Sequence, residues 1–275
     1  MSATAIDTGT NDLLASLDEG VLTLTLNRPE ARNAMSGAMT AALAQQLAAA
    51  ELDPRVKCVV LTGAGRGFCA GGDVKGMAAR GDGTVGDNTI DGAIHRQRVN
   101  QRATAGKLYK MPKPTIASLP GAAAGAGLSL ALACDLRIMA GDAIMTTAFA
   151  KVGFSGDYGG TFFLTQLVGS AKARELYYLS PRVSAEDALR LGLANWVCPP
   201  EKLADKTREV ALELARGPTV AYRYMKENLN RAIAGEVDDC LDIEATHHVH
   251  CGQTADHREA AKAFVEKRQP VFAGR

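Results

Sequence analysis

Two short runs of residues with almost no side chain constrain this chain most. Ala70-Gly71-Gly72 and Gly125-Ala126-Gly127 each follow a predicted strand, and each leads toward a predicted helix. The first backbone N–H groups of a helix have no partner within that helix, so such turns present free hydrogen-bond donors. The same small residues would also permit close packing, or supply a positive φ angle at a turn.

Neither turn matches a nucleotide-phosphate cradle. The chain has no GxxxxGK[ST] motif, and no GxGxxG sequence opens a helix in its first βαβ-like unit. Two N–H groups aimed at one point would instead form an oxyanion hole, in which each donor stabilises a developing oxyanion by roughly 3–4 kcal/mol. The pair of turns therefore indicates chemistry on a carbonyl group.

The spacing of apolar residues predicts an α/β fold. Residues 13–26 alternate as two strands joined at Glu19-Gly20, Ser36 starts an Ala/Leu-rich helix, and residues 58–61 form a buried strand. The order strand, small-residue turn, helix then recurs over residues 115–134.

Composition divides the chain into three predicted parts. Residues 1–12 form a loose tail, residues 13–199 a β-rich core, and residues 200–275 a helical C-terminal subdomain without a convincing strand. A length of 275 residues suits one large core with such an appended segment.

Charge and hydropathy exclude several classes of partner. Lys and Arg total 31 against 30 for Asp and Glu, and a net charge of +1 argues against nucleic acid while leaving room for a small anionic ligand. No apolar run reaches the ~20 residues that cross a bilayer, so no membrane partner is expected. The six cysteines are far apart with no secretory signal before them, so we expect free thiols and a cytoplasmic protein.

Four separated motifs resemble one known family. They are Gly67-Phe-Cys-Ala-Gly-Gly-Asp-Val-Lys75, Leu26-Asn-Arg-Pro29 followed by Asn33-Ala34, Gly125-Ala-Gly-Leu-Ser-Leu-Ala-Leu-Ala-Cys-Asp135, and the C-terminal sequence KAFVEKRQPVF. From about residue 13 to 272 the chain resembles the enoyl-CoA hydratase/isomerase (crotonase) superfamily. The resemblance implies a spiral of ββα units, a helical C-terminal part that builds homotrimers or dimers of trimers, and acyl-coenzyme A (acyl-CoA) thioesters as substrates.

The resemblance also implies which residues form the site. It assigns the oxyanion-hole donors to the N–H groups of Gly72 and Ala126, in agreement with the two turns. The positions matched to coenzyme A and to the acyl group are Arg28, Glu30, Ala31, Arg32, Ala70, Gly72, Asp73, Val74, Lys75, Ser129, Phe149, Phe264 and Lys267.

Some of these assignments have alternatives. The basic side chains Arg28, Arg32, Arg66 and Lys75 would face coenzyme A phosphates or simply solvent. Phe264 and Lys267 would close over coenzyme A bound by their own or a neighbouring subunit, or serve only in packing.

No separate cofactor is implied, because coenzyme A is part of the substrate. His247, His250 and Cys251 share a helix face and have plausible metal-ligand chemistry. Since the family uses no metal, surface or subunit-contact roles are expected for them instead.

The chain departs from the hydratase pattern of this family at two positions. Family hydratases use two glutamates, as base and acid on opposite sides of one water molecule. Ser129 and Phe149 occupy the matching positions here. Serine does not act as a base near neutral pH and phenylalanine has no proton to transfer, so hydration by two glutamates is not expected.

One acid remains at the acyl-facing position. Asp157 resembles the proton-shuttling acid of dienoyl-CoA isomerases and of the ring-opening isomerases of phenylacetate catabolism, and the nucleophile of 4-chlorobenzoyl-CoA dehalogenases. A single carboxylate suits a 1,3-proton shift through an enolate held by the oxyanion hole. Phe149, Phe154 and Tyr158 would desolvate it and raise its pKa. The alternative role for Asp157 is a helix N-cap.

Two other functions stay open. Ser129 and Asp157 together would position a water molecule for the hydration of an enoyl-CoA or the hydrolysis of an acyl-CoA. The loss of both glutamates is also compatible with a catalytically idle acyl-CoA binder or assembly subunit.

Overall fold

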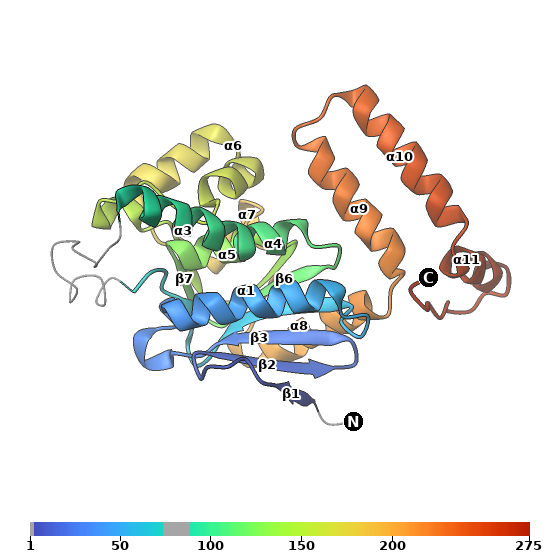
Figure 1. Ribbon diagram of the computed structural model, residues 1–275, viewed down its shortest axis with the longest axis horizontal. Helices are drawn as coiled ribbons and strands as arrows, with labels where there is room; N and C mark the ends of the chain where they lie inside the picture. Colours follow the sequence, from blue (N-terminus) through green and yellow to red (C-terminus); the bar gives the residue numbers. More distant parts are fainter. Residues whose placement is uncertain (1–2, 74–88) are drawn as a thin grey trace.

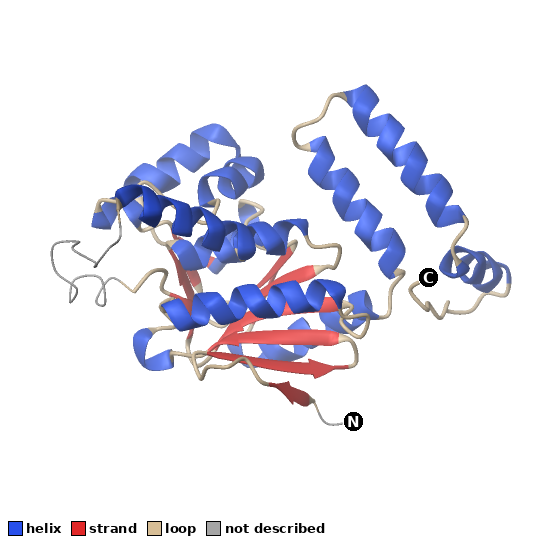
Figure 2. Ribbon diagram, viewed as in Figure 1, coloured by secondary structure: helices blue, strands red, loops and turns tan. Residues whose placement is uncertain are grey.

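Two sheets form the framework of the computed structural model, which describes residues 3–73 and 89–275 (Figure 1, Figure 2). The larger sheet has the order β1-β2-β3-β4-β6-β8-β11, and the smaller has the order β10-β9-β7-β5. The strands are β1 (Thr4–Ile6), β2 (Leu13–Asp18), β3 (Val21–Leu26), β4 (Cys58–Gly63), β5 (Gly67–Cys69), β6 (Thr115–Leu119), β7 (Ala122–Ala124), β8 (Leu136–Ala140), β9 (Ile144–Thr146), β10 (Val183–Ser184) and β11 (Trp196–Cys198).

Successive units of the chain each give one strand to each sheet. β4 leads into β5, β6 into β7, and β8 into β9, and within each sheet these strands pair in parallel. Helices then return the chain to the next unit. This arrangement is the spiral of ββα units that the family resemblance implies, and the α/β fold class is confirmed.

Helices cover both faces of the larger sheet. α1 packs against β2 and β3, and α8 packs against β3, β4, β6 and β8 from behind in the view of Figure 1. The central strands are therefore buried on both faces, which accounts for the continuous apolar run of β4. The helices are α1 (Gly37–Leu52), α3 (Ile90–Ala103), α4 (Ala105–Lys110), α5 (Ala126–Ala133), α6 (Gly160–Leu179), α7 (Ala185–Arg190), α8 (Leu203–Ala215), α9 (Thr219–Ala232), α10 (Val237–Gly252) and α11 (Ala255–Val265), with short 3-10 turns at Pro29–Ala31, Phe149–Val152 and Pro200–Lys202.

The turn and the helix start predicted near the beginning of the chain are confirmed, but the predicted tail is wrong in part. Glu19 and Gly20 have φ angles of 45° and 84°, as a tight turn between β2 and β3 requires. Ser36 Oγ accepts the Met39 N–H at the start of α1. The loose tail predicted for residues 1–12 is wrong for Thr4–Ile6, which pair with β2 in antiparallel register. β2 would otherwise leave an open sheet edge.

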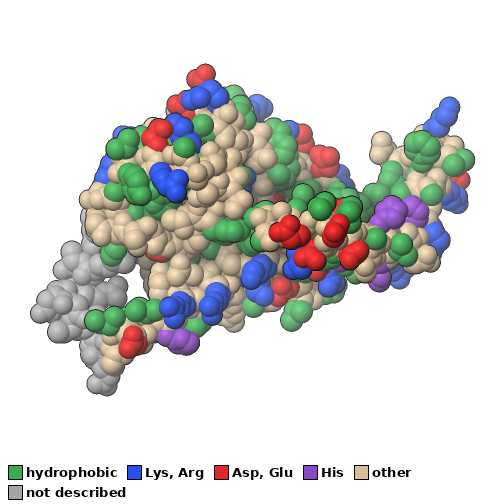
Figure 3. Space-filling model, turned by 90° about the horizontal axis from the view of Figure 1, so that it is seen from above, with side chains coloured by type: hydrophobic (Ala, Val, Ile, Leu, Met, Phe, Trp, Pro, Cys, Tyr) green, Lys and Arg blue, Asp and Glu red, His purple; other side chains and the backbone are tan. Residues whose placement is uncertain are grey.

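The last three helices leave the core. α8 lies on the sheet although it falls within the predicted subdomain 200–275, whereas α9, α10 and α11 form an arm that projects from the core (Figure 1, Figure 3). Lys226 of α9 ties the arm to the core. Its Nζ donates to the Leu108 carbonyl at 2.9 Å, the Lys113 carbonyl at 3.2 Å and Asp135 Oδ2 at 2.8 Å. No helix in the described ranges is long and apolar enough to cross a membrane.

Lys226→Met is expected to lower the free energy of unfolding by about 3 kcal/mol, because Asp135 and two carbonyls lose their buried cation. Urea denaturation of the purified protein measures this change. Lys172→Met is the control, since Lys172 pairs with Glu175 on the exposed surface and such a pair contributes less than about 0.5 kcal/mol. If both variants lose the same amount, Lys226 does not hold the arm.

Candidate active site

The two glycine turns lie in direct backbone contact. β5 and β7 pair in parallel, so the turns that follow them meet at one edge of the smaller sheet. A Cβ on Gly71, whose φ is +92°, would stand 2.8 Å from the Ala124 carbonyl oxygen and 3.2 Å from the Ala126 nitrogen. A Cβ on Gly127 would stand 2.4 Å from the Cys69 carbonyl oxygen. Only glycine fits at either position.

Each turn carries an N–H group that the fold leaves unused. Met35 N–H donates to the Gly71 carbonyl at 2.8 Å in a parallel bridge, which does not engage the Gly72 N–H. Ala126 is the first residue of α5, and its N-cap, Gly125, makes no side-chain cap. Within residues 3–73 and 89–275, neither the Gly72 N–H nor the Ala126 N–H donates a hydrogen bond. Both N–H groups therefore meet one condition for an oxyanion hole, namely that no described residue already accepts from them.

Asp157 lies in a tight turn before α6. Its Oδ1 atom is buried and has no hydrogen-bond partner among the described residues. Burial raises its pKa to about 6. The N-cap of α6 is Gly159, and Asp157 meets the helix only through its own carbonyl, which accepts the Gly160 N–H at 3.0 Å. A side-chain N-cap role for Asp157 is therefore wrong.

The Asp157 carboxyl is an electrostatic neighbour of the first glycine turn. Burial raises the pKa of the Cys69 thiol to about 12, and the Asp157 charge adds to that effect. The same order of causes, burial and then Asp157, raises the pKa of Tyr158 to about 12 and the pKa of Tyr177 further still. The Asp157 carbonyl accepts the Gly160 N–H, and Gly160 packs against Ser129 in the first turn of α5, so the Asp157 turn lies against the helix that follows the second glycine turn.

Aromatic side chains form the wall behind Asp157. Phe149 and Tyr158 are buried, as expected, and Phe149 stacks on Tyr177 with ring centroids 5.9 Å apart. Phe154 is 56% exposed, so the expectation that it shields Asp157 is wrong. Tyr177 was not predicted. Its position near the end of α6 gives no local signal, because only the folding of that helix over the Asp157 turn brings it into the wall.

Small residues let Tyr177 and Ser129 approach the turn. A Cβ on Gly160 would stand 2.6 Å from the Tyr177 hydroxyl and 2.3 Å from Ser129 Oγ. Ser129 is buried, and its hydroxyl donates to the Gly125 carbonyl at 3.3 Å. Its proton is thus engaged within α5, which weakens the case for Ser129 as a water-positioning residue.

The segment matched to coenzyme A begins with an arginine that is already paired. Arg28 donates to the Ala34 carbonyl at 2.8 Å and forms an ion pair with Asp73 at 3.2 Å, with Asp12 at 3.9 Å. These two carboxylates compete with a phosphate for the Arg28 guanidinium, and a contact of Arg28 with coenzyme A stays a prediction. Val74 and Lys75 lie outside the described residues.

Asn33 links the segment that begins at Arg28 to β5, the strand that leads into the first glycine turn. It is buried at a φ of 56°, its Oδ1 accepts the Arg28 N–H, and its Nδ2 donates to the Ala64 and Gly67 carbonyls. The sequence contains Asn33 in a family motif, but gives no sign of this double bridge.

A basic cavity of about 680 Å³ lies next to the glycine turns. Ala70 and Ala124 line it on one side, and Glu30 and Ala31 precede it in the 3-10 turn that ends at Arg32. Its cations are Arg32, Arg66, Lys151 and Arg182, and none of the described residues that line it is acidic. Lys151 and Arg182 were not predicted, because they come from distant parts of the chain.

The predicted C-terminal contacts do not reach this site within one chain. Phe264 is 86% exposed on α11, and Lys267 follows that helix at the far end of the arm (Figure 1). Closure over coenzyme A of the same subunit is therefore wrong, and closure over a neighbour's stays a prediction.

The histidines of the arm do not gather as a metal site. Within the described ranges, no group of three His, Cys, Asp or Glu side chains could hold a metal ion. His247 instead bonds Asn228 through Nδ1 and stacks on Tyr224.

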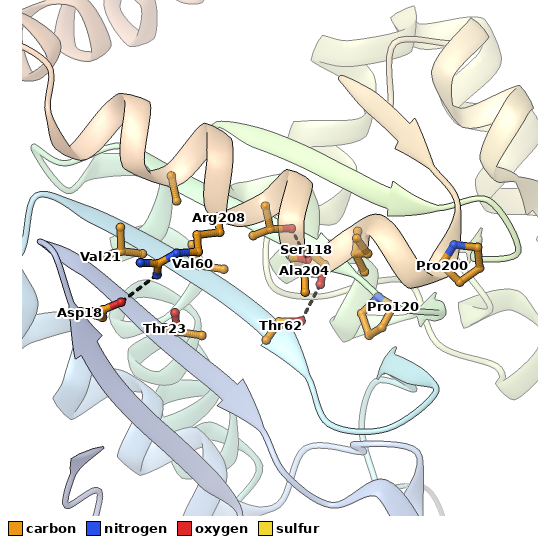
Figure 4. Close-up of a pocket in the computed structure, with 13 residues that line it drawn as sticks. Asp18, Val21, Thr23, Val60, Thr62, Ser118, Pro120, Pro200, Ala204 and Arg208 are labelled. Atoms are coloured by element: carbon orange, nitrogen blue, oxygen red, sulfur yellow. Dashed lines mark hydrogen bonds and ion pairs between the residues drawn. The ribbon is translucent and has the colours of Figure 1, made fainter. Parts of the chain in front are cut away.

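A second cavity, of about 380 Å³, lies between the larger sheet and α8 (Figure 4). Several of its polar groups are paired with one another: Thr62 donates to the Ser118 carbonyl, Ser118 bonds Thr207, and Arg208 pairs with Asp18. None of the predicted site residues lines it.

Asp157→Asn is expected to stabilise the protein at about pH 7.5 by about 1–3 kcal/mol. Folding raises the pKa of Asp157 from 3.8 to about 6, so the folded state holds this proton more tightly than the unfolded state. The stability this group contributes is present below pH 3.8 and is lost as the pH rises through about 6. Urea unfolding of both proteins across this range measures the difference.

The two proteins should have equal stability near about pH 4. Asp142→Asn, at an exposed carboxylate, serves as the control and should change stability by less than about 0.5 kcal/mol at either pH. An Asp157→Asn protein that is less stable than the parent at the higher pH would contradict this account of the buried acid.

Comparison with known proteins agrees with this geometry. Residues 16–275 match the family model described as enoyl-CoA hydratase/isomerase. The chain is 39% identical to the 1,2-epoxyphenylacetyl-CoA isomerase of Escherichia coli (strain K12), over 96% of this chain and 98% of that protein. It is 32% identical to the short-chain-enoyl-CoA hydratase of Clostridium acetobutylicum, over 94% of this chain and 96% of that protein.

A solved structure leads to the same family. The crystal structure of an enoyl-CoA hydratase from Polaromonas sp. JS666 matches with a TM-score of 0.88 and 32% identity, over 94% of this chain and 99% of that chain. The fold, the family model and the relatives therefore agree, and the chain belongs to the enoyl-CoA hydratase/isomerase family.

Proposed function

We propose that this protein is an acyl-CoA isomerase that moves a proton along the acyl chain through an enolate, with Asp157 as the acid and base. Two observations carry the proposal: the Oδ1 atom of Asp157 is buried without a hydrogen-bond partner among the described residues, and the N–H groups of Gly72 and Ala126 donate no hydrogen bond to any described residue. A carboxyl whose pKa is about 6 is present in both protonation states near neutral pH. It is thus suited both to take and to return a proton.

The reaction needs no other group to balance. The thioester oxygen accepts hydrogen bonds from the N–H groups of Gly72 and Ala126. The Asp157 carboxylate removes a proton from an activated carbon, and the electron pair of that C–H bond moves into the conjugated system toward the thioester oxygen. Protonated Asp157 then gives the proton to a carbon two positions along, so the double bond moves and no atom is gained or lost.

Water addition is the weaker candidate. Relatives include proteins named as hydratases, but Phe149 and Ser129 stand where family hydratases are expected to carry their two glutamates. The Ser129 proton is engaged by the Gly125 carbonyl. A relative at 39% identity is named an isomerase, which supports the proton shift.

A catalytically idle acyl-CoA binder is also less well supported than the isomerase. Binding of the thioester needs the N–H pair and the basic cavity, and does not need a desolvated carboxyl. Burial of Asp157 costs stability as the pH rises through about 6. Such a cost is typical of a group that takes part in chemistry.

The basic cavity supports binding of the coenzyme A phosphates. We propose that Arg32, Arg66, Lys151 and Arg182 surround the phosphates, while Ala70 and Ala124 direct the thioester end toward the N–H pair. Arginine and lysine are the usual partners of phosphate oxygens.

The arm supports assembly with further copies of this chain. Seven of its large apolar side chains are 53% to 86% exposed, namely Met225, Leu229, Val237, Leu241, Val249, Phe264 and Val265. Exposed apolar side chains in such number are typical of a subunit contact. We propose a homotrimer or a dimer of trimers, with Phe264 and Lys267 near a neighbour's coenzyme A. The six cysteines are free, which supports a cytoplasmic location.

Asp157→Asn is expected to lower kcat on an enoyl-CoA isomerisation substrate by about 10³-fold, because the amide cannot take the proton. KM for the thioester should change by less than about threefold, since binding depends on the N–H pair and the cavity. Asp238→Asn, at an exposed acid of α10, is the control and should keep full turnover. Full turnover by Asp157→Asn would overturn the proposed function.

Turnover of the parent protein in ¹⁸O-labelled water separates the reaction classes. An isomerase gives a product without label, whereas hydration or hydrolysis incorporates one oxygen atom from water. Mass spectrometry of the product measures this directly. Label in the main product would reject the isomerase.

Arg66→Gln and Arg182→Gln should each raise KM for the acyl-CoA about five- to tenfold at unchanged kcat, because each removes a charge that faces phosphate. KM for the matching acyl-pantetheine, which has no nucleotide phosphates, should not change. Arg174→Gln, at an exposed arginine of α6, is the control. An equal rise for both thioesters would remove these arginines from the phosphate site.

A further inference from the structure

The turn that carries Asp157 is held in an unusual backbone conformation. Gly156, Tyr158 and Gly159 have φ angles of +114°, +49° and +76°. Glycine adopts such angles readily, but Tyr158 does so only where its surroundings hold it. Because Asp157 Oδ1 has no hydrogen-bond partner among the described residues, the direction of this carboxyl depends on the backbone of the turn.

The side chain of Gln101, from a distant helix, bonds to the backbone of this turn. Gln101 Oε1 accepts the Tyr158 N–H at 2.5 Å, across 57 positions of sequence. Gln101 lies in the last turn of α3 and is half-buried. That turn is itself fixed, since the Thr104 N–H and hydroxyl both donate to the Asn100 carbonyl, at 3.1 Å and 2.7 Å.

We propose that Gln101 is a positioning residue for Asp157, which fixes the Tyr158 peptide and so aims the carboxyl at the substrate carbon. This inference rests on the proposed function of Asp157 as acid and base. Gln101 does not touch the reacting atoms in this account. Its amide oxygen is a neutral acceptor for the Tyr158 N–H, so it fixes the backbone of the turn without placing a second charge beside Asp157.

Two substitutions of Gln101 separate the effect of losing the hydrogen-bond acceptor from the effect of adding a charge near Asp157. Gln101→Leu removes the acceptor and leaves the Tyr158 N–H unpaired, so the turn relaxes. Gln101→Glu retains an acceptor oxygen at the same reach, and adds a negative charge near Asp157 that raises the pKa of that acid. Asn100→Leu, at an exposed amide in the same turn of α3, is the matched control.

The test compares kcat, KM and the pH dependence of kcat for these variants, with circular dichroism and thermal unfolding to count folded protein. Gln101→Leu should lower kcat per folded molecule by about 10- to 100-fold with KM within about twofold, as expected for a misplaced catalytic group. Gln101→Glu should recover kcat to within about fivefold at its own optimum, with the acidic limb of the profile moved to higher pH. Asn100→Leu should match the parent protein.

Several results would overturn this role. One is a Gln101→Leu protein with unchanged kcat per folded molecule, and another is a Gln101→Glu protein that stays as slow as Gln101→Leu. A third is an additive loss when Gln101→Leu is combined with Asp157→Asn, because a residue that acts through Asp157 has no effect once the acid is gone. If Asp157→Asn alone keeps its turnover, the proposed function fails; if it loses turnover while Gln101→Leu does not, only the role of Gln101 fails.

Discussion

Close backbone contact between two glycine turns is the constraint on which the rest of the site depends. Gly71 and Gly127 lie so near other backbone atoms that a methyl group fits at neither position. The contact follows from the parallel pairing of β5 and β7, which brings the ends of two sequence-distant strands to the same edge. It brings Gly71 next to the Ala126 nitrogen, and within the described residues the N–H groups of Gly72 and Ala126 donate no hydrogen bond. In the proposed function, these two main-chain N–H groups bind the thioester carbonyl.

The burial of Asp157 lowers the stability of the fold once the carboxyl is ionised. Its carboxyl is desolvated by Tyr158, Tyr177 and the stacked Phe149, and the turn beneath it contains a tyrosine with positive φ. Each feature costs stability, and each would serve the proposed proton shift: desolvation raises the pKa of Asp157 toward neutrality, and a rigid turn would fix where the proton is taken and returned. Natural sites commonly combine local instability with chemistry in this way.

The sequence predicts best what local chemistry decides. The glycine turns, the Ser36 cap and Asp157 are each visible in a few adjacent residues, and the family resemblance orders them along the chain. Long-range packing decides the rest. The pairing of residues 4–6 with β2 and the approach of Tyr177 to the Asp157 turn have no local signal. The basic cavity likewise gathers its cations from segments that meet only in the folded chain, while the expected cation, Arg28, is paired with carboxylates.

Isotope-edited infrared spectroscopy of a bound acyl-CoA with ¹³C at its thioester carbonyl tests the central claim most directly. The Asp157→Asn protein would hold the unreacted thioester during the measurement. Two N–H donors aimed at the oxygen polarise the C=O bond, so the labelled band should move to lower frequency than in free solution. A band at or above the free-solution frequency would mean that the Gly72 and Ala126 N–H groups do not donate hydrogen bonds to the thioester oxygen, and would contradict the proposed oxyanion hole.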